Sequence, residues 1–258
     1  QAKRQTITAS SDSALGKVIQ ALHLIQEGNL LEAIDTFHFS ISQDATLAAA
    51  HYELGKALLR LDDTANATEA FRQTTELLPL FSPAWANLGA ALGESRNFVD
   101  AEKALSKAIS LDPFSYALHS NLGVTYREQE KFDEAERILE KSLALAPDFV
   151  FGHYNLASVY FLSGNYGKAV KKFEKARSLD AIGSPRQSLM LAASRIGSGD
   201  MYGGLKDYRQ IIGHLNGEKR HTLTAIAMQD LKQLGNHLGL SPELKEAVAL
   251  IRTLAVKD

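Results

Sequence analysis

The sequence of 258 residues contains no cysteine. Disulfide bonds, thiolate nucleophiles and zinc sites built on cysteine are therefore excluded. The chain also lacks an apolar run of about 18 residues, the length that predicts a membrane-spanning helix, so we expect no membrane insertion by this segment. The 28 basic residues are offset by 30 acidic ones, and neither sign forms a block. A basic face of the kind that binds nucleic acid is missing, and we expect no nucleic-acid partner.

The centre of the chain, from Ser82 to Gly183, repeats itself at a fixed step. Asn87, Asn121 and Asn155 stand 34 residues apart. The other aligned columns are Leu88, Leu122 and Leu156; Gly89, Gly123 and Ala157; Phe98, Phe132 and Tyr166; Ala101, Ala135 and Ala169; Leu105, Leu139 and Phe173; and Ala108, Ser142 and Ala176. A constant step of this length is typical of stacked repeats, in which each unit buries its apolar face against its neighbour.

Each repeat predicts two helices joined by a short turn. Apolar residues recur three and four positions apart on both sides of a polar break, which falls at Arg96–Asn97, Glu130–Lys131 and Gly164–Asn165. Small residues such as Gly89 and Ala101 allow the two helices to approach closely. Because no apolar period is near two, we expect an all-α fold with essentially no sheet.

These motifs resemble the tetratricopeptide repeat. Its signature of W-x₂-L-G-x₂-Y, A-x₃-F and P is matched by Trp85, Leu88, Gly89, Ala101 and Pro113. The resemblance implies a right-handed superhelical α-solenoid of stacked antiparallel helix pairs. It also implies that the first helices of successive repeats line a concave groove, where many members of the family bind peptides.

The step extends in both directions and divides the chain. We expect a flexible N-terminal segment at 1–13, six repeats, and C-terminal capping helices at 218–258, with helices over Thr222–Leu234 and Ser241–Val256. The repeats are 14–47, 48–81, 82–115, 116–149, 150–184 and 185–217. The sixth follows a one-residue slip and carries Gly203 and Gly204 where the others have alanine. Glycine weakens helices, so we expect this repeat to fray first.

The residues that invite a catalytic or metal hypothesis have simpler interpretations. His51, His119 and His153 fill the column of Trp85, and no His-x₃-His pair accompanies them, so we interpret them as packing residues. Glu94 and Glu128 are expected to lie on a solvated surface, because no pocket that would enclose the two carboxylates is predicted. We therefore expect no metal site, no cofactor and no enzymatic activity.

A binding surface remains as the expected function. We expect the groove to be formed by first-helix residues, with the three asparagines holding a peptide backbone and three aromatic residues forming an apolar patch at one end. The candidates are Asn87, Asn121, Asn155, Tyr52, Lys56, Arg60, Arg127, Phe151, Tyr154 and Phe161. The asparagine column resembles the ladder in the repeats of O-linked N-acetylglucosamine transferase, although asparagine at this position is also common in repeats that bind nothing there.

Three functions stay open. The first is a non-catalytic scaffold or adaptor that binds an extended peptide segment of a protein partner. The second is a structural component of a bacterial envelope or pilus-assembly complex that packs by its convex face or ends. The third is a substrate-recruiting fragment of a larger enzyme. Self-association through the groove or the terminal helices stays open, as does location: cytoplasmic, or periplasmic or anchored if an upstream signal was removed.

Overall fold

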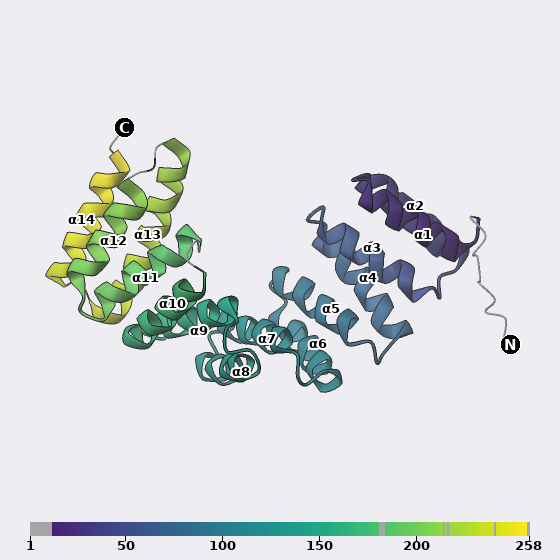
Figure 1. Cartoon of the computed structure of the whole chain (residues 1–258), viewed down its shortest axis with the longest axis horizontal. Coiled ribbons are helices and arrows are strands. Elements are labelled where there is room, and N and C mark those ends of the chain that lie inside the picture. Colours follow the sequence, from purple (N-terminus) through teal and green to yellow (C-terminus); the bar gives the residue numbers. More distant parts are fainter. Residues whose placement is uncertain (1–11, 181–183, 214, 216, 240, 257–258) are drawn as a thin grey trace. The chain divides into compact units, whose positions relative to one another are not determined.

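The computed structural model describes residues 12–180, 184–213, 215, 217–239 and 241–256. The expected flexible segment at 1–13 lies outside this range except for its last two residues. The chain forms two compact units, Gln1–Thr125 and Tyr126–Asp258. Every regular element in the described ranges is a helix, and no strand occurs there (Figure 1). The expected all-α fold of stacked helix pairs, an α-solenoid, is confirmed.

Helices follow one another at short intervals in both units. The first unit contains α1 (Ala14–Gln26), α2 (Leu30–Gln43), α3 (Ala48–Leu59), α4 (Thr64–Leu77), α5 (Ser82–Glu94), α6 (Phe98–Leu111) and most of α7 (Tyr116–Glu128). The second contains the end of α7, then α8 (Phe132–Leu145), α9 (Val150–Leu162), α10 (Tyr166–Leu179), α11 (Pro185–Gly197), α12 (Met201–Gly213), α13 (Gly217–Leu238) and α14 (Pro242–Val256). Within the units, α1 packs on α2, α3 on α4, α5 on α6, α9 on α10 and α11 on α12.

The turn inside each helix pair has one residue in the left-handed region. Gly28, Asp62, Arg96, Glu130 and Gly164 stand 34 residues apart, and all have φ between 58° and 88°. The next such residue, Gly199, follows Gly164 by 35 residues, one more than the repeat step, as the one-residue slip before the sixth repeat predicts. Glycine adopts a positive φ most easily, so this backbone conformation costs free energy at Asp62, Arg96 and Glu130. The turn of the repeat requires it nevertheless.

The aligned columns of the second helices form the cores of the two units. Side chains in these columns are almost completely buried: Ala33, Ala67, Ala101, Ala135 and Ala169; Phe37, Phe71, Leu105, Leu139 and Phe173; and Ser40, Thr74, Ala108, Ser142 and Ala176. The small residues bring each second helix close to its partner. A small residue is also required at Gly89 on a first helix, because a Cβ placed there would lie 2.6 Å from Cγ of Leu105.

Gly204 has a packing role that composition alone did not predict. A Cβ at this position would lie 2.5 Å from Cγ1 of Ile196 and 2.7 Å from the carbonyl oxygen of Ala192. The missing side chain therefore lets α12 approach α11, as alanine does at the same place in other repeats. Early fraying of this repeat stays a prediction.

The last two helices complete the second unit. Helix α13 begins before the expected Thr222, runs past Gly235 and ends at Leu238, before Gly239 with φ of +73°. The Oγ of Ser241 accepts a 3.2 Å hydrogen bond from N of Leu244, which caps α14 as expected. Helix α14 packs on α12 and α13, while α13 also packs along α11. No helix in the described part of the chain is both long and apolar enough to cross a membrane.

Candidate functional site

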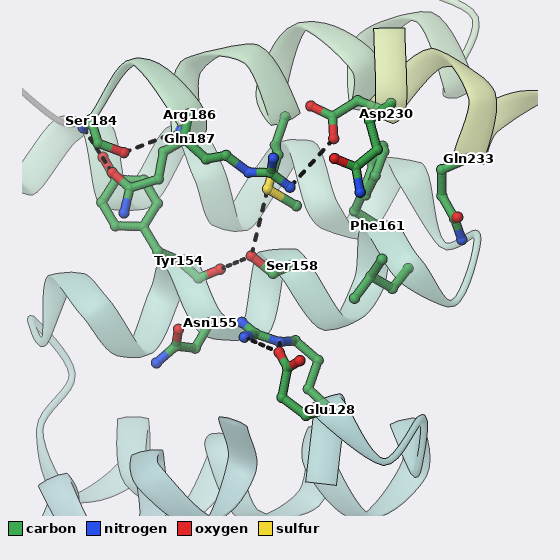
Figure 2. Close-up of a pocket in the computed structure, with 14 residues that line it drawn as sticks. Glu128, Tyr154, Asn155, Ser158, Phe161, Ser184, Arg186, Gln187, Asp230 and Gln233 are labelled. Carbon is green, nitrogen blue, oxygen red and sulfur yellow. Dashed lines mark hydrogen bonds and ion pairs between the residues drawn. The ribbon is translucent and has the colours of Figure 1, made fainter. Parts of the chain in front are cut away.

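The second unit contains a hollow of about 330 Å³ bounded by four helices (Figure 2). Its lining comes from the end of α7 and from α9, α11 and α13: Arg127, Glu128, Tyr154, Asn155, Ser158, Phe161, Leu162, Ser184, Arg186, Gln187, Met190, Gln229, Asp230 and Gln233. The volume is at the small end of the range for ligand pockets, about 300–1,000 Å³, so it suits a few side chains of a partner. Four of the predicted candidates line it: Arg127, Tyr154, Asn155 and Phe161.

Helix α9 supplies one wall through residues three and four positions apart, which lie on one helical face. Tyr154, Asn155 and Ser158 follow this spacing and come from the middle of the helix (Figure 2). The Oγ of Ser158 donates to the carbonyl oxygen of Tyr154 at 2.9 Å, and the Tyr154 ring lies 6.2 Å from that of Phe173. Burial raises the pKa of the Tyr154 phenol above its usual range. This wall is firmly packed and mixed in polarity.

The three aromatic residues expected to form one apolar patch do not share an environment. Phe161 is only 1% exposed, because it faces α10 and packs its ring edge-on against Tyr166 at 5.7 Å. Tyr154 is 6% exposed, whereas Phe151 is 65% exposed, contacts the Phe149 ring at 6.1 Å and is absent from the lining of the hollow. Phe161 and Tyr154 therefore belong to the packed wall, and Phe151 is a separate surface residue.

Charged residues stand on two sides of the hollow. On α7, Nη2 of Arg127 lies 2.6 Å from Oε1 of Glu128, so the two charges neutralise each other. On α13, the carboxylate of Asp230 is 3% exposed, and its Oδ1 lies 3.6 Å from Nη2 of Arg186 on α11. Burial raises the pKa of Asp230 to about 6, although the Arg186 charge opposes the shift.

The beginning of α11 is held in place by a capping box. The Oγ of Ser184 accepts from N of Gln187 at 3.3 Å, and Oε1 of Gln187 accepts from N of Ser184 at 2.9 Å. This arrangement fixes the turn that carries Arg186. Further along the helix, Sδ of Met190 lies 4.0 Å from Oγ of Ser158 and gives the hollow an apolar side.

Sequence reasoning missed the half of the hollow that α11 and α13 provide. The sequence predicts a cap at the final helices, and the repeat period that exposes groove positions stops before α13. One signal was available: Asp230 stands beside Ala227, Leu231 and Leu234 on the apolar face of α13, and all three are buried. A carboxylate on such a face needs an explanation, because burial of a charge is costly.

The candidates in the first unit form a smaller cluster. The Oη of Tyr52 accepts a 3.2 Å hydrogen bond from Nδ2 of Asn87, and Nζ of Lys56 lies 5.3 Å from the Tyr52 ring centre. Lys56 also pairs with Glu53 at 2.9 Å. Arg60 is exposed just after α3, and Asn121 is exposed on α7. The structure thus joins Tyr52, Lys56 and Asn87 and leaves Arg60 and Asn121 apart.

The histidine column is part of the packing. Nε2 of His51 lies 3.0 Å from the Ala45 carbonyl oxygen and Nε2 of His153 lies 2.8 Å from that of Pro147, just as Trp85 donates to Pro79 at 2.9 Å. Each contact joins a ring nitrogen to a carbonyl six residues earlier. His119 instead contacts the carbonyl of Ser115 through Nδ1 at 2.8 Å. In the part of the chain that the structure describes, no group of three or more His, Asp or Glu could hold a metal.

Comparisons with known proteins agree with this architecture. Two family models described as tetratricopeptide repeat match residues 52–117 and 114–179. Among solved structures, the chain is similar to PilW, described as a widely conserved type IV pilus biogenesis factor, with 21% identity, a TM-score of 0.66, and coverage of 91% of this chain and 98% of that one.

Two further structures are similar in fold. PilF of Pseudomonas aeruginosa has 19% identity, a TM-score of 0.62, and coverage of 92% of this chain and 96% of that one. A tetratricopeptide repeat protein of Parabacteroides merdae has 13% identity, a TM-score of 0.69, and coverage of 93% and 98%. A comparison with curated proteins finds no match.

Tetratricopeptide repeat proteins are in general non-catalytic scaffolds for protein–protein interaction. The repeat motifs, the described helix pairs and both family-model matches lead to one assignment. The chain is a tetratricopeptide repeat protein.

Proposed function

We propose that this scaffold binds an extended segment of a partner protein and that the hollow of the second unit is the place where the segment binds. The observation that carries the proposal is the lining itself: residues of three first helices and of α13 bring amide, hydroxyl and charged groups around one space of about 330 Å³. Asn155 and Ser158 lie on one face of α9, with Gln187 opposite on α11 (Figure 2). Amide groups of this kind can donate to a peptide C=O and accept from a peptide N–H.

The asparagine column extends the proposal to the other repeats. Asn87 and Asn121 lie in the first unit and Asn155 in the second, at the same position of three first helices. Each amide that bonds to a peptide backbone contributes about 0.5–1.5 kcal/mol, so Asn155 alone accounts for a roughly two- to tenfold change in Kd. Backbone recognition tolerates many side chains, and sequence selectivity must therefore come from other residues of the hollow.

The test begins with selection of a ligand. A phage library of random 12-residue peptides is selected on the full chain, and a synthetic peptide from the selection is titrated by fluorescence anisotropy. We expect Asn155→Ala to weaken binding two- to tenfold and Asn155→Ala with Ser158→Ala to weaken it further. Gln210→Ala, an exposed position of α12 outside the hollow, is the matched control and should leave Kd unchanged. Equal affinities of all variants would contradict binding in the hollow.

A second candidate function follows from the length over which PilW matches. The similarity covers 91% of this chain and 98% of PilW, so it extends well beyond the central repeats. In this alternative the chain is a component of a pilus-assembly complex and packs by its outer surface. Leu80 and Phe114 occupy equivalent loop positions one step apart, are 77% and 80% exposed, and are suitable contact residues.

A complementation assay separates the two candidates. In a bacterium that carries the gene and makes pili, a deletion strain is complemented with Leu80→Asp/Phe114→Asp or with Asn155→Ala. Loss of surface pili with the first variant but not the second would favour packing by the outer surface. Normal pili in the deletion strain itself would contradict the pilus role.

A further inference from the structure

Asp230 is the most unusual side chain in the hollow. It is 3% exposed, and in the described part of the chain its Oδ2 has no hydrogen-bond partner. Its Oδ1 faces Arg186 at 3.6 Å, which is longer than the 2.7–2.9 Å of a formed charge-assisted hydrogen bond. Figure 2 shows both groups at the edge of the same space. A buried carboxylate with an unused oxygen is an acceptor for which a donor has to be found.

The cations already at the hollow do not satisfy Asp230. Arg127 is paired with Glu128 at 2.6 Å on the α7 side. Arg186 is the nearer guanidinium, but 44% of its side chain is exposed and its contact with Asp230 is loose. Removal of Arg186 alone would leave a buried charge uncompensated, but an incoming cation that pairs with Asp230 compensates this charge in its place. The site is therefore built to hold a cation and is occupied by a replaceable one.

The rest of the lining fits the stem of a long basic side chain. Leu162 and Met190 provide apolar surface, and Gln229 and Gln233 flank Asp230 on α13. Lysine and arginine bury their methylene groups against apolar surface and direct the charge to a polar partner. A carboxylate ligand fits less well, because it would draw Arg186 away and leave two negative charges side by side.

We infer that the hollow of the second unit takes a lysine or arginine side chain of the partner segment, whose cationic head binds the Asp230 carboxylate in place of Arg186. The inference rests on the proposed function, since the peptide backbone lies along α9 and α11 and directs the side chain inward. Asp230 then supplies the sequence selectivity that asparagine amides cannot. Arg186 acts as an internal competitor.

The experiment uses the peptide library on three forms of the full chain: wild type, Asp230→Asn and Arg186→Gln. Asp230→Asn keeps the shape of the side chain and removes its charge. We expect peptides selected by the wild type to share one lysine or arginine position, and peptides selected by Asp230→Asn to lose that preference. Replacement of the basic residue by glutamine in a synthetic peptide should weaken binding to wild type at least tenfold and to Asp230→Asn less than twofold.

Arg186→Gln should change the affinity for the basic peptide in the opposite direction to Asp230→Asn. It therefore distinguishes binding of a basic side chain from binding of a carboxylate. Removal of the competitor should tighten binding of the basic peptide about two- to fivefold. If Arg186→Gln abolishes binding and the selected peptides are acidic, the hollow takes a carboxylate and the inference is wrong. If free arginine or spermidine binds as tightly as the peptide, the site is for small cations and the inference is also wrong.

The outcomes keep the inference and the proposed function distinct. Peptides that bind the wild type and respond to Asn155→Ala, but show no basic position and no response to Asp230→Asn, would overturn the inference and leave the proposed function standing. A wild-type chain that selects no peptide would overturn both. Circular dichroism of each variant confirms that a change in affinity does not come from unfolding.

Discussion

Replacement of Gly89 by alanine should destabilise the third repeat, whereas the same replacement at Gly93, one turn later on α5, should stabilise it. A Cβ at residue 89 would lie 2.6 Å from Cγ and 3.0 Å from Cδ2 of Leu105 and 3.3 Å from the carbonyl oxygen of Ala101. Leu105 is buried in the core, and the atom nearest to the added Cβ is its Cγ, not the mobile end of the side chain. A Cβ at residue 93 would have no atom within 4 Å. Only the first replacement forces α5 away from α6.

The magnitudes follow from the two environments. Overpacking of a close contact costs about 1–3 kcal/mol. Alanine in place of glycine inside a helix, without a clash, contributes about 0.5–1 kcal/mol of stability. The two variants should therefore differ by about 1.5–4 kcal/mol, although their sequences differ from the wild type by one methyl group each.

The chain provides its own probe for this comparison. Trp85 is the single tryptophan and lies on α5, so its fluorescence reports on the unfolding of the third repeat. Urea unfolding followed by this fluorescence, together with circular dichroism for the whole chain, gives the two shifts in midpoint. A Gly89→Ala variant as stable as Gly93→Ala would refute the view that small residues are needed there for close approach of the helices.

Three further predictions concern turns, titration and local stability. Gly28→Ala should lower stability by about 1–2 kcal/mol in urea unfolding, because residue 28 has φ of +88° and nothing within 4 Å to cause a clash, and no loss would show that the turn can relax. Asp230→Asn should raise stability at pH 7.5 and not below pH 4, because burial raises the folded pKa of this carboxyl from 3.8 to about 6 and the ionised form is the unfavourable one. The difference between the folded pKa, which already includes the opposing Arg186 charge, and the unfolded pKa corresponds to about 3 kcal/mol. Tyr208, whose own pKa is raised by burial and also by the Asp230 charge, stays neutral throughout this range; a gain that does not change with pH would contradict this cause. In hydrogen exchange, amides of α11 and α12 should open before those of α5 to α10, and the reverse order would show that the sixth repeat is not the weak one.

The repeat period accounts for most of what the sequence could predict. Once the columns of Ala101, Leu105 and Ala108 are aligned, every second helix has its buried face fixed, because a constant step repeats the same contacts. The same alignment placed Asn155 and Tyr154 on the first-helix face that lines the hollow. The repeat period alone is therefore enough to predict which face of each helix is buried and which face lines the hollow.

The parts that the sequence did not predict lie where the period fails or where a helical face is broad. Phe161 shares spacing with Tyr154 and Ser158, yet its ring turns to α10 and packs on Tyr166, because the end of α9 lies against the next helix. Asp230 could not be assigned to the hollow, since the contact of α13 with α11 is a tertiary one and no repeat column predicts it. Helix faces follow from spacing, whereas contacts between distant helices do not.

The absence of cysteine allows a direct test of where the partner segment binds. A single cysteine is introduced at Gln229, which is exposed and lines the hollow, or at Gln210, which is exposed on α12 outside it. The rate of maleimide labelling is measured with and without a selected peptide. At a peptide concentration ten times Kd, labelling of Gln229→Cys should slow about tenfold, because only the free fraction reacts, and labelling of Gln210→Cys should not change. Unchanged labelling of Gln229→Cys at saturation would contradict binding in the hollow of the second unit.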